Sequence, residues 1–136
     1  MLSIVDAGPL VAVLDASDVH HAACLAALGR ADLQLVIPAL VVAEVSFFAG
    51  RRLGPTVEAA FLRGLSGFDV QPPLADDWVR IAELVEQYAN FPLGGTDASV
   101  IALAERLGTD LVITLDRRHF GAVRPRHVQS LRLLPD

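Results

Sequence analysis

Hydrophobic and polar positions along the chain follow two periods in turn, and these periods predict alternating strands and helices. Short apolar runs bounded by turn residues predict buried strands, and they occupy residues 2–5, 35–37, 68–71 and 111–115, with an edge strand at 130–134. Apolar residues spaced by three or four predict helices, at residues 9–15, 19–28, 38–53, 56–65, 75–89 and 96–107. This alternation is typical of an α/β fold with a mostly parallel central sheet and helices on both faces.

Length and composition favour one globular domain. The chain has 136 residues, of which 53% are hydrophobic and 20% are charged. A chain of this size can bury a proper core, and this composition is too apolar for a disordered segment. We therefore expect residues 1–136 to form a single domain.

Charge and cysteine content bear on the ligands that the protein can bind and on its cellular compartment. The net charge is −5, and all eleven cationic residues are arginine. Arginine forms bidentate contacts with phosphate. The few positive charges therefore suit phosphate binding, although the net charge of the chain is negative. Cys24 is the one cysteine, which excludes a disulfide within the chain. Neither a signal peptide nor a membrane span is predicted, and we expect a cytoplasmic protein.

Two acidic residues directly follow predicted strands. Asp6 comes after the first strand and Asp116 after the strand at 111–115. The carboxyl ends of parallel strands lie at one edge of a sheet, where ligands bind in open α/β sheets, so we expect the two carboxylates at the same edge. Taken singly, each could instead cap a turn, as Asp often does.

Glu44 has only apolar neighbours on its own side of the predicted helix. The residues three and four positions away are Leu40, Val41, Phe47 and Phe48. This pattern places the carboxylate on the buried face, where an ionised group needs an arginine, backbone donors or a metal ion as partner. A structural Arg–Glu pair is the competing interpretation.

Asp97 opens the helix predicted at residues 96–107. Thr96 or Asp97 is expected to be the N-cap of this helix, a role that does not exclude metal binding. Thr96 and Ser99 are expected to donate hydrogen bonds that orient the neighbouring carboxylates.

Carboxylates gathered without a cation repel one another and either shift their pKa values or recruit cations. The four candidates are Asp6, Glu44, Asp97 and Asp116. Hard, oxygen-seeking Mg²⁺ suits such a pocket, and Mn²⁺ is possible. Such ions support water attack at phosphorus.

Four segments together resemble the PIN-domain ribonucleases, and within them the VapC-type toxins of type II toxin–antitoxin pairs. They are residues 4–10 (IVDAGPL), 42–45 (VAEV), 95–102 (GTDASVIA) and 114–120 (TLDRRHF). The resemblance covers nearly the whole chain in order. It implies a three-layer α/β/α fold, Mg²⁺-dependent endoribonuclease activity, a homodimer and a small cognate antitoxin.

The family's acidic residues correspond here to Asp6, Glu44, Asp97 and Asp116. One departure is that many members carry Thr or Ser just after the first Asp, where this chain has Ala7 and Gly8. From the attraction of an acidic pocket for cations, we expect the antitoxin to insert a basic side chain there. Its apolar tail is expected in a groove lined by Val41, Val45 and Phe48.

Other side chains are weaker candidates. The candidates for RNA contact are Arg51, Arg52, Arg117 and Arg118, although adjacent arginines are more often a solvated face. His119 could touch substrate, and we expect the large aromatic side chains, Phe47, Phe48, Trp78 and Phe91, in the core or a dimer contact.

Two other classes of protein are alternatives to a nuclease. A receiver-type phosphoacceptor domain also gathers acids at strand ends, but that family uses a lysine, and this chain has none. A catalytically weak PIN fold that acts only through a protein partner is the remaining alternative. Metal-dependent RNA cleavage by the purified protein separates it from an enzyme.

Overall fold

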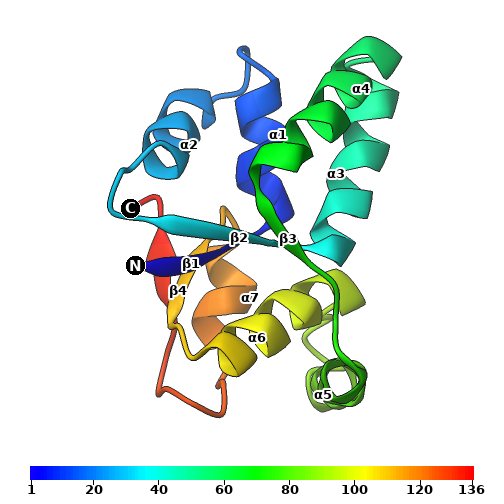
Figure 1. The fold of residues 1–136 in the computed structure, drawn as a ribbon. Helices are drawn as coiled ribbons and strands as arrows, with labels where there is room; N and C mark the ends of the chain where they lie inside the picture. The colour runs from blue at the N-terminus through cyan, green and yellow to red at the C-terminus, as the bar shows by residue number, and fades with distance from the viewer.

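A five-stranded sheet lies between two layers of helices in the computed structural model, which describes all 136 residues (Figure 1). The strands are β1 (Leu2–Val5), β2 (Gln34–Pro38), β3 (Asp69–Gln71), β4 (Leu111–Ile113) and β5 (Arg132–Leu134). Their order is β3-β2-β1-β4-β5, and every neighbouring pair is parallel. The predicted parallel sheet is confirmed, with no antiparallel strand.

The helices are divided between the two faces of the sheet (Figure 1). One face carries α1 (Ala7–Leu14), α2 (His21–Leu28), α3 (Ala39–Arg52) and α4 (Pro55–Gly64), and a 3-10 turn, η1 (Leu65–Gly67), follows α4. The other face carries α5 (Ala75–Gln87), α6 (Gly95–Leu107) and α7 (Arg117–Ala122). The predicted three-layer α/β/α arrangement is confirmed.

Helix α7 was not predicted from the sequence. It has six residues, RRHFGA, and only Phe120 among them is buried. A segment this short with one buried apolar residue shows no helical periodicity in its sequence. Predicted helix boundaries otherwise differ from the observed ones by two residues or fewer at each end.

The sequence of helix α3 explains where this helix begins and ends. Val41, Val45 and Ala49 recur every four residues and are buried against the core. Pro38 ends β2 and precedes the first turn of the helix. Gly54, with a φ of 93°, turns the chain beyond its end, a conformation that favours glycine. The next helix then begins at Pro55, where a missing N–H costs nothing.

The centre of the sheet is closed to solvent. Ile4, Val36 and Val112, from the three central strands, each have 0% exposure. Helices cover both faces of a parallel sheet of this kind, so its strands have no polar side. This explains why these strands are continuous apolar runs in the sequence. No helix is long and apolar enough to cross a membrane.

The strand order reverses direction beside β1. The chain adds β2 and β3 on one side of β1 and then crosses over to add β4 and β5 on the other. In open α/β sheets, ligands bind outside the carboxyl ends of the strands at such a reversal. Val5 pairs in register with Ile113, so the residues that follow β1 and β4 emerge at one place.

Candidate active site

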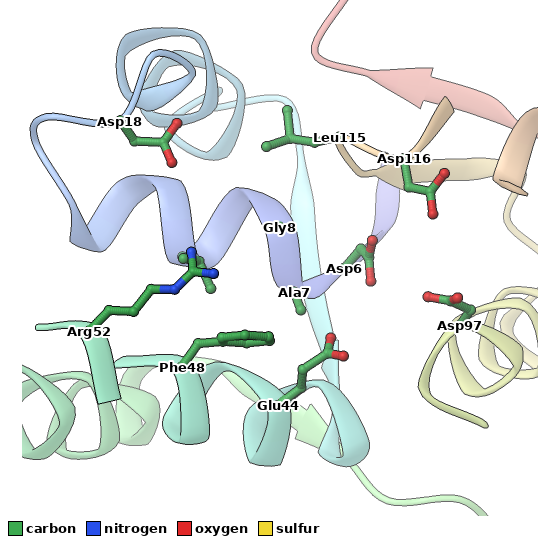
Figure 2. A pocket seen from close by; sticks show the side chains of 11 residues that line it. Asp6, Ala7, Gly8, Asp18, Glu44, Phe48, Arg52, Asp97, Leu115 and Asp116 are labelled. Atoms are coloured by element: carbon green, nitrogen blue, oxygen red, sulfur yellow. The ribbon is translucent and has the colours of Figure 1, made fainter. Parts of the chain in front are cut away.

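Five carboxylates line one cavity of about 560 Å³ at the carboxyl edge of the sheet: the four candidates and Asp18. Asp6 follows β1, Asp116 follows β4, Glu44 comes from α3, and Asp97 lies in the first turn of α6. Figure 2 shows the four side chains directed toward a common space. The four residues singled out in the sequence are therefore brought together by the fold.

Asp6 is the most buried of the four, with 6% of its surface exposed. Its backbone N–H donates to the carbonyl of Ile113 at 2.9 Å, which holds it against β4. Although Asp6 precedes the first residue of α1, its carboxylate makes no capping bond to that helix. Burial raises the pKa of this carboxyl, and the charge on Asp116 raises it further.

Thr114 supports the site and was not singled out in the sequence. Its hydroxyl donates to Asp6 Oδ2 at 2.7 Å and accepts from the N–H of Asp116 at 3.0 Å. Ala7 and Gly8 provide no hydroxyl next to Asp6, so the hydroxyl comes from the adjoining strand instead. The sequence TLD, which places Thr two residues before Asp116, could have indicated this supporting hydroxyl.

Asp97 is not an N-cap, and neither is Thr96. Gly94 has the extended backbone of the N-cap, so α6 begins at Gly95 and Asp97 is its third residue. Its pKa is raised to about 6, first by burial and then by the negative charges of the other three carboxylates.

The expected hydrogen bonds from Thr96 and Ser99 to the carboxylates are absent from this structure. The Ser99 hydroxyl donates instead to the backbone carbonyl of Thr96 at 2.6 Å, within the same helical turn. A hydroxyl has one hydrogen to donate, so Ser99 has none left for a carboxylate. No hydrogen bond from the Thr96 side chain is present.

Glu44 is half-buried and not on the fully buried face of its helix. The stripe formed by Val41, Val45 and Ala49 faces the core, and Glu44 lies beside it, on the wall of the cavity. No arginine pairs with Glu44, so a structural Arg–Glu pair is excluded here. Burial raises the pKa of Glu44, and the Asp6 charge adds to the effect.

Asp116 is held through both of its carboxylate oxygens. The backbone N–H of His119 donates to Oδ1 at 2.9 Å, and Nδ1 of the same residue lies 2.8 Å from Oδ2. An ionised carboxylate only accepts, so Nδ1 carries the hydrogen. The imidazole packs against Phe91 with ring centroids 4.7 Å apart, and its Nε2 is buried without a partner.

The donor set fits a divalent ion that keeps part of its water shell. Asp6, Glu44 and Asp97 have no cationic partner, and each has its pKa raised by a neighbouring charge. As the side chains stand, no three of them are arranged to hold one ion directly. Mg²⁺ is usually bound by one or two carboxylates with waters completing its shell, which this open arrangement allows.

The four candidate arginines have different surroundings. Arg52 lines the cavity, whereas Arg51 lies over the exposed ring of Phe47. Arg117 donates to the carbonyl of Pro135 near the chain end. Arg118 lies over the ring of Phe91, with its guanidinium carbon 5.3 Å from the ring centre.

The four large aromatic side chains expected in the core or a dimer contact differ in burial. Phe47 is 58% exposed and Trp78 is 52% exposed, so neither belongs to the core. Phe48 and Phe91 are partly buried, and Phe48 lines the cavity. Phe47 and Trp78 lie at helix positions outside the buried stripes of α3 and α5.

Comparison with known sequences agrees with this architecture. The family model described as "PIN domain" matches residues 3–124. A curated protein from Mycobacterium tuberculosis (strain ATCC 25618 / H37Rv), Ribonuclease VapC26, is 36% identical over 124 residues. That alignment covers 90% of this chain and 92% of the relative.

Solved structures with the same fold include VapC20 and VapBC2. The crystal structure of Mycobacterium tuberculosis VapC20, described as a sarcin-ricin loop cleaving toxin, has a TM-score of 0.80 at 18% identity and covers 96% of this chain and 99% of its own. VapBC2 from Rickettsia felis, bound to a DNA fragment from its promoter, has a TM-score of 0.71 at 16% identity, with 99% and 100% covered. At these identities the structures establish the fold alone. Because the family model and the 36% identical relative each span most of the sequence, the chain belongs to the PIN-domain family, in its VapC-type ribonuclease branch.

Proposed function

We propose that this protein is a metal-dependent endoribonuclease and the toxin of a type II toxin–antitoxin pair. The observation that carries the proposal is the cavity in which four carboxylates face one another, three of them without a cationic partner. Such an arrangement is unfavourable unless a cation offsets the repulsion. The name of the 36% identical relative, a ribonuclease, supports RNA as the substrate.

Asp6, Glu44, Asp97 and Asp116 would hold the ion together, one or two of them directly and the others through its water shell. Mg²⁺ or Mn²⁺, when bound, supplies positive charge that offsets the charge developing on the phosphate and eases proton loss from water. The chain's own part is to fix the carboxylates. Thr114 orients Asp6, and His119 orients Asp116.

The reaction is hydrolysis of a phosphodiester. Water gives up a proton as it forms a new bond to phosphorus, the bond from phosphorus to one ribose oxygen breaks, and that oxygen takes up a proton, so the overall reaction consumes one water molecule. In the ion-free protein Asp97 holds a proton up to about pH 6, because burial and three like charges disfavour its ionisation. Positive charge held among the carboxylates would favour the ionised form of Asp97, the form that can bind a cation.

A small antitoxin and a second copy of the chain are the expected partners. One solved structure of this fold is a toxin–antitoxin complex from Klebsiella pneumoniae, which supports an antitoxin partner. The expectation that Val41 and Val45 line a groove for its apolar tail is wrong, because both side chains have 0% exposure. The homodimer stays a prediction, and light scattering at micromolar concentration tests it.

Asp97→Asn tests the nuclease assignment against a pure binding role. The change keeps the side-chain shape and removes one charge, so cleavage of RNA in Mg²⁺ should fall by orders of magnitude. The matched control is Asp76→Asn, an exposed acid in the first turn of α5, away from the cavity. Equal cleavage by both folded variants would overturn the role of Asp97. No cleavage by the unmodified protein in Mg²⁺ or Mn²⁺ would favour the binding module.

A further inference from the structure

Three residues of α3 form a row along one wall of the cavity. Glu44, Phe48 and Arg52 are four residues apart, so they lie on one face of the helix. All three line the cavity, as Figure 2 shows. At 1.5 Å per residue, Arg52 lies about 12 Å beyond Glu44 along the helix axis. The cavity therefore runs from the carboxylates to a cation at its far end.

Arg52 is the one cationic side chain that lines this cavity, and it has no ion pair. Five other arginines are engaged by carboxylates within 4.0 Å, namely Arg30, Arg80, Arg106, Arg126 and Arg132. Asp18 lies across the cavity from Arg52 (Figure 2), but its Oδ1 accepts from the N–H of His20 at 2.8 Å. The guanidinium thus keeps its hydrogen-bond donors free.

Phe48 orients this guanidinium. The Arg52 guanidinium carbon is 5.1 Å from the centre of the Phe48 ring, within the range of a cation–π contact. A guanidinium stacked on a ring loses less freedom when it binds, and its edge still offers paired donors to a phosphate. The Phe48 ring is partly buried on the wall of the cavity.

We propose that Arg52, positioned by Phe48, binds a backbone phosphate of a single-stranded RNA at a fixed distance from the bond that is cut. This rests on the nuclease function proposed above and specifies how that site takes its substrate. The strand runs along α3, with one phosphate at the carboxylates and another at Arg52. A polyanion needs such a cation in an acidic cavity, and Arg52 is the one that the fold places there.

The chain supplies a matched control for this proposal. Arg51 is the adjacent residue, carries the same charge, and stacks on Phe47 at 5.3 Å, but it does not line the cavity. Arg51→Ala and Arg52→Ala therefore remove equal charge from equivalent cation–π pairs. A difference in RNA binding between the two variants is therefore due to the position of the guanidinium and not to the net charge.

The test is the fluorescence anisotropy of a labelled oligouridylate in Mg²⁺, with Asp97→Asn in every protein so that the probe stays intact. Arg52→Ala should weaken binding about tenfold, the size of one charge-assisted contact. It should also reduce the salt dependence of log K by about 0.7, the value for one phosphate contact on a single strand. Arg51→Ala should change neither, and Phe48→Ala should weaken binding only where Arg52 is present.

Neutral methylphosphonate linkages then locate the phosphate. One neutral linkage should weaken binding to the Arg52 protein, and the same linkage should have no effect in Arg52→Ala. Equal losses from Arg51→Ala and Arg52→Ala, or no loss from either, would overturn the proposal. So would Arg52-dependent binding of polyglutamate in place of the RNA, which would assign the groove to an acidic protein segment.

The outcome is separable from the nuclease assignment. Cleavage by the protein with Asp97 intact, combined with no effect of Arg52→Ala on binding, leaves the enzyme standing and removes the phosphate site. Arg52-dependent binding of the oligouridylate without cleavage supports the phosphate site and removes the proposed catalysis.

Discussion

The hydroxyl of Thr114 donates a buried hydrogen bond of 2.7 Å to Oδ2 of Asp6, between two neighbouring strands. The two residues are 108 positions apart in the chain. They meet because β1 and β4 pair in parallel and both end at the same edge of the sheet. The same hydroxyl accepts from the N–H of Asp116, so one side chain links two of the four acids.

Thr114→Val should lower the free energy of unfolding by about 2 kcal/mol, because it removes one hydrogen bond to a buried carboxylate and one from a backbone N–H. Valine has nearly the same shape, so no cavity is created. Urea denaturation at neutral pH measures the loss. Thr114→Ser keeps the hydroxyl and should retain most of the stability; equal losses in the two variants would show that the methyl group, not the hydrogen bond, is what matters.

The stability of the ion-free protein should depend on pH through Asp97. Its pKa is about 6 in the folded protein and about 3.8 when unperturbed. Between these values the folded protein holds a proton that the unfolded chain has released, so this group's contribution to stability falls as the pH rises through the window.

Other carboxyls have the opposite effect, so the test is a difference between two proteins. Arg132 holds the pKa of Asp110 below its ordinary value, and stability from that pair is lost as the pH falls. Denaturation curves in EDTA for the unmodified protein and Asp97→Asn isolate the Asp97 contribution. The variant should gain stability relative to the unmodified protein as the pH rises from 4 to 6; parallel curves would mean that Asp97 ionises normally.

Divalent ions should raise the melting temperature. An ion that binds only the folded state stabilises it by RT ln(1 + [L]/Kd), about 2.7 kcal/mol at a hundredfold excess over Kd. Scanning calorimetry with Mg²⁺ or Mn²⁺ measures the shift, and NaCl at equal ionic strength controls for general screening. The shift should shrink in Asp97→Asn. No greater effect from millimolar Mg²⁺ than from the matched NaCl would count against the metal site.

His119 should be needed for activity more than for folding. His119→Phe keeps the ring packed on Phe91 but removes the donor to Asp116 Oδ2. We expect about a 10- to 100-fold loss of Mg²⁺ affinity or cleavage, the usual effect of removing a group that orients a metal ligand. His119→Asn places a donor near the position of Nδ1 and should recover part of the loss. Calorimetric titration of Mg²⁺ separates the binding defect from a folding defect.

The sequence by itself determined every helix and strand except α7, and it determined the identity of the acids. The short apolar runs of β1, β2 and β4 are typical of strands buried on both faces, and the period of α3 is set by Val41, Val45 and Ala49. Acids placed directly after β1 and β4 follow from the same local patterns. The N-cap of α6 was predicted wrongly: it is Gly94, not Thr96 or Asp97. Several neighbouring residues could adopt the extended backbone of an N-cap, so the local sequence does not decide among them.

Only the tertiary structure decided which residues meet. No local pattern states that β4 pairs with β1, and that pairing brings Thr114 to Asp6 and completes the carboxylate cavity. The roles of Arg51 and Arg52 also separate only when α1 and α3 pack together, because adjacent helical residues look alike until one face acquires a neighbour. Contacts between distant segments depend on how whole elements pack, and neither periodicity nor propensity along the chain carries that information.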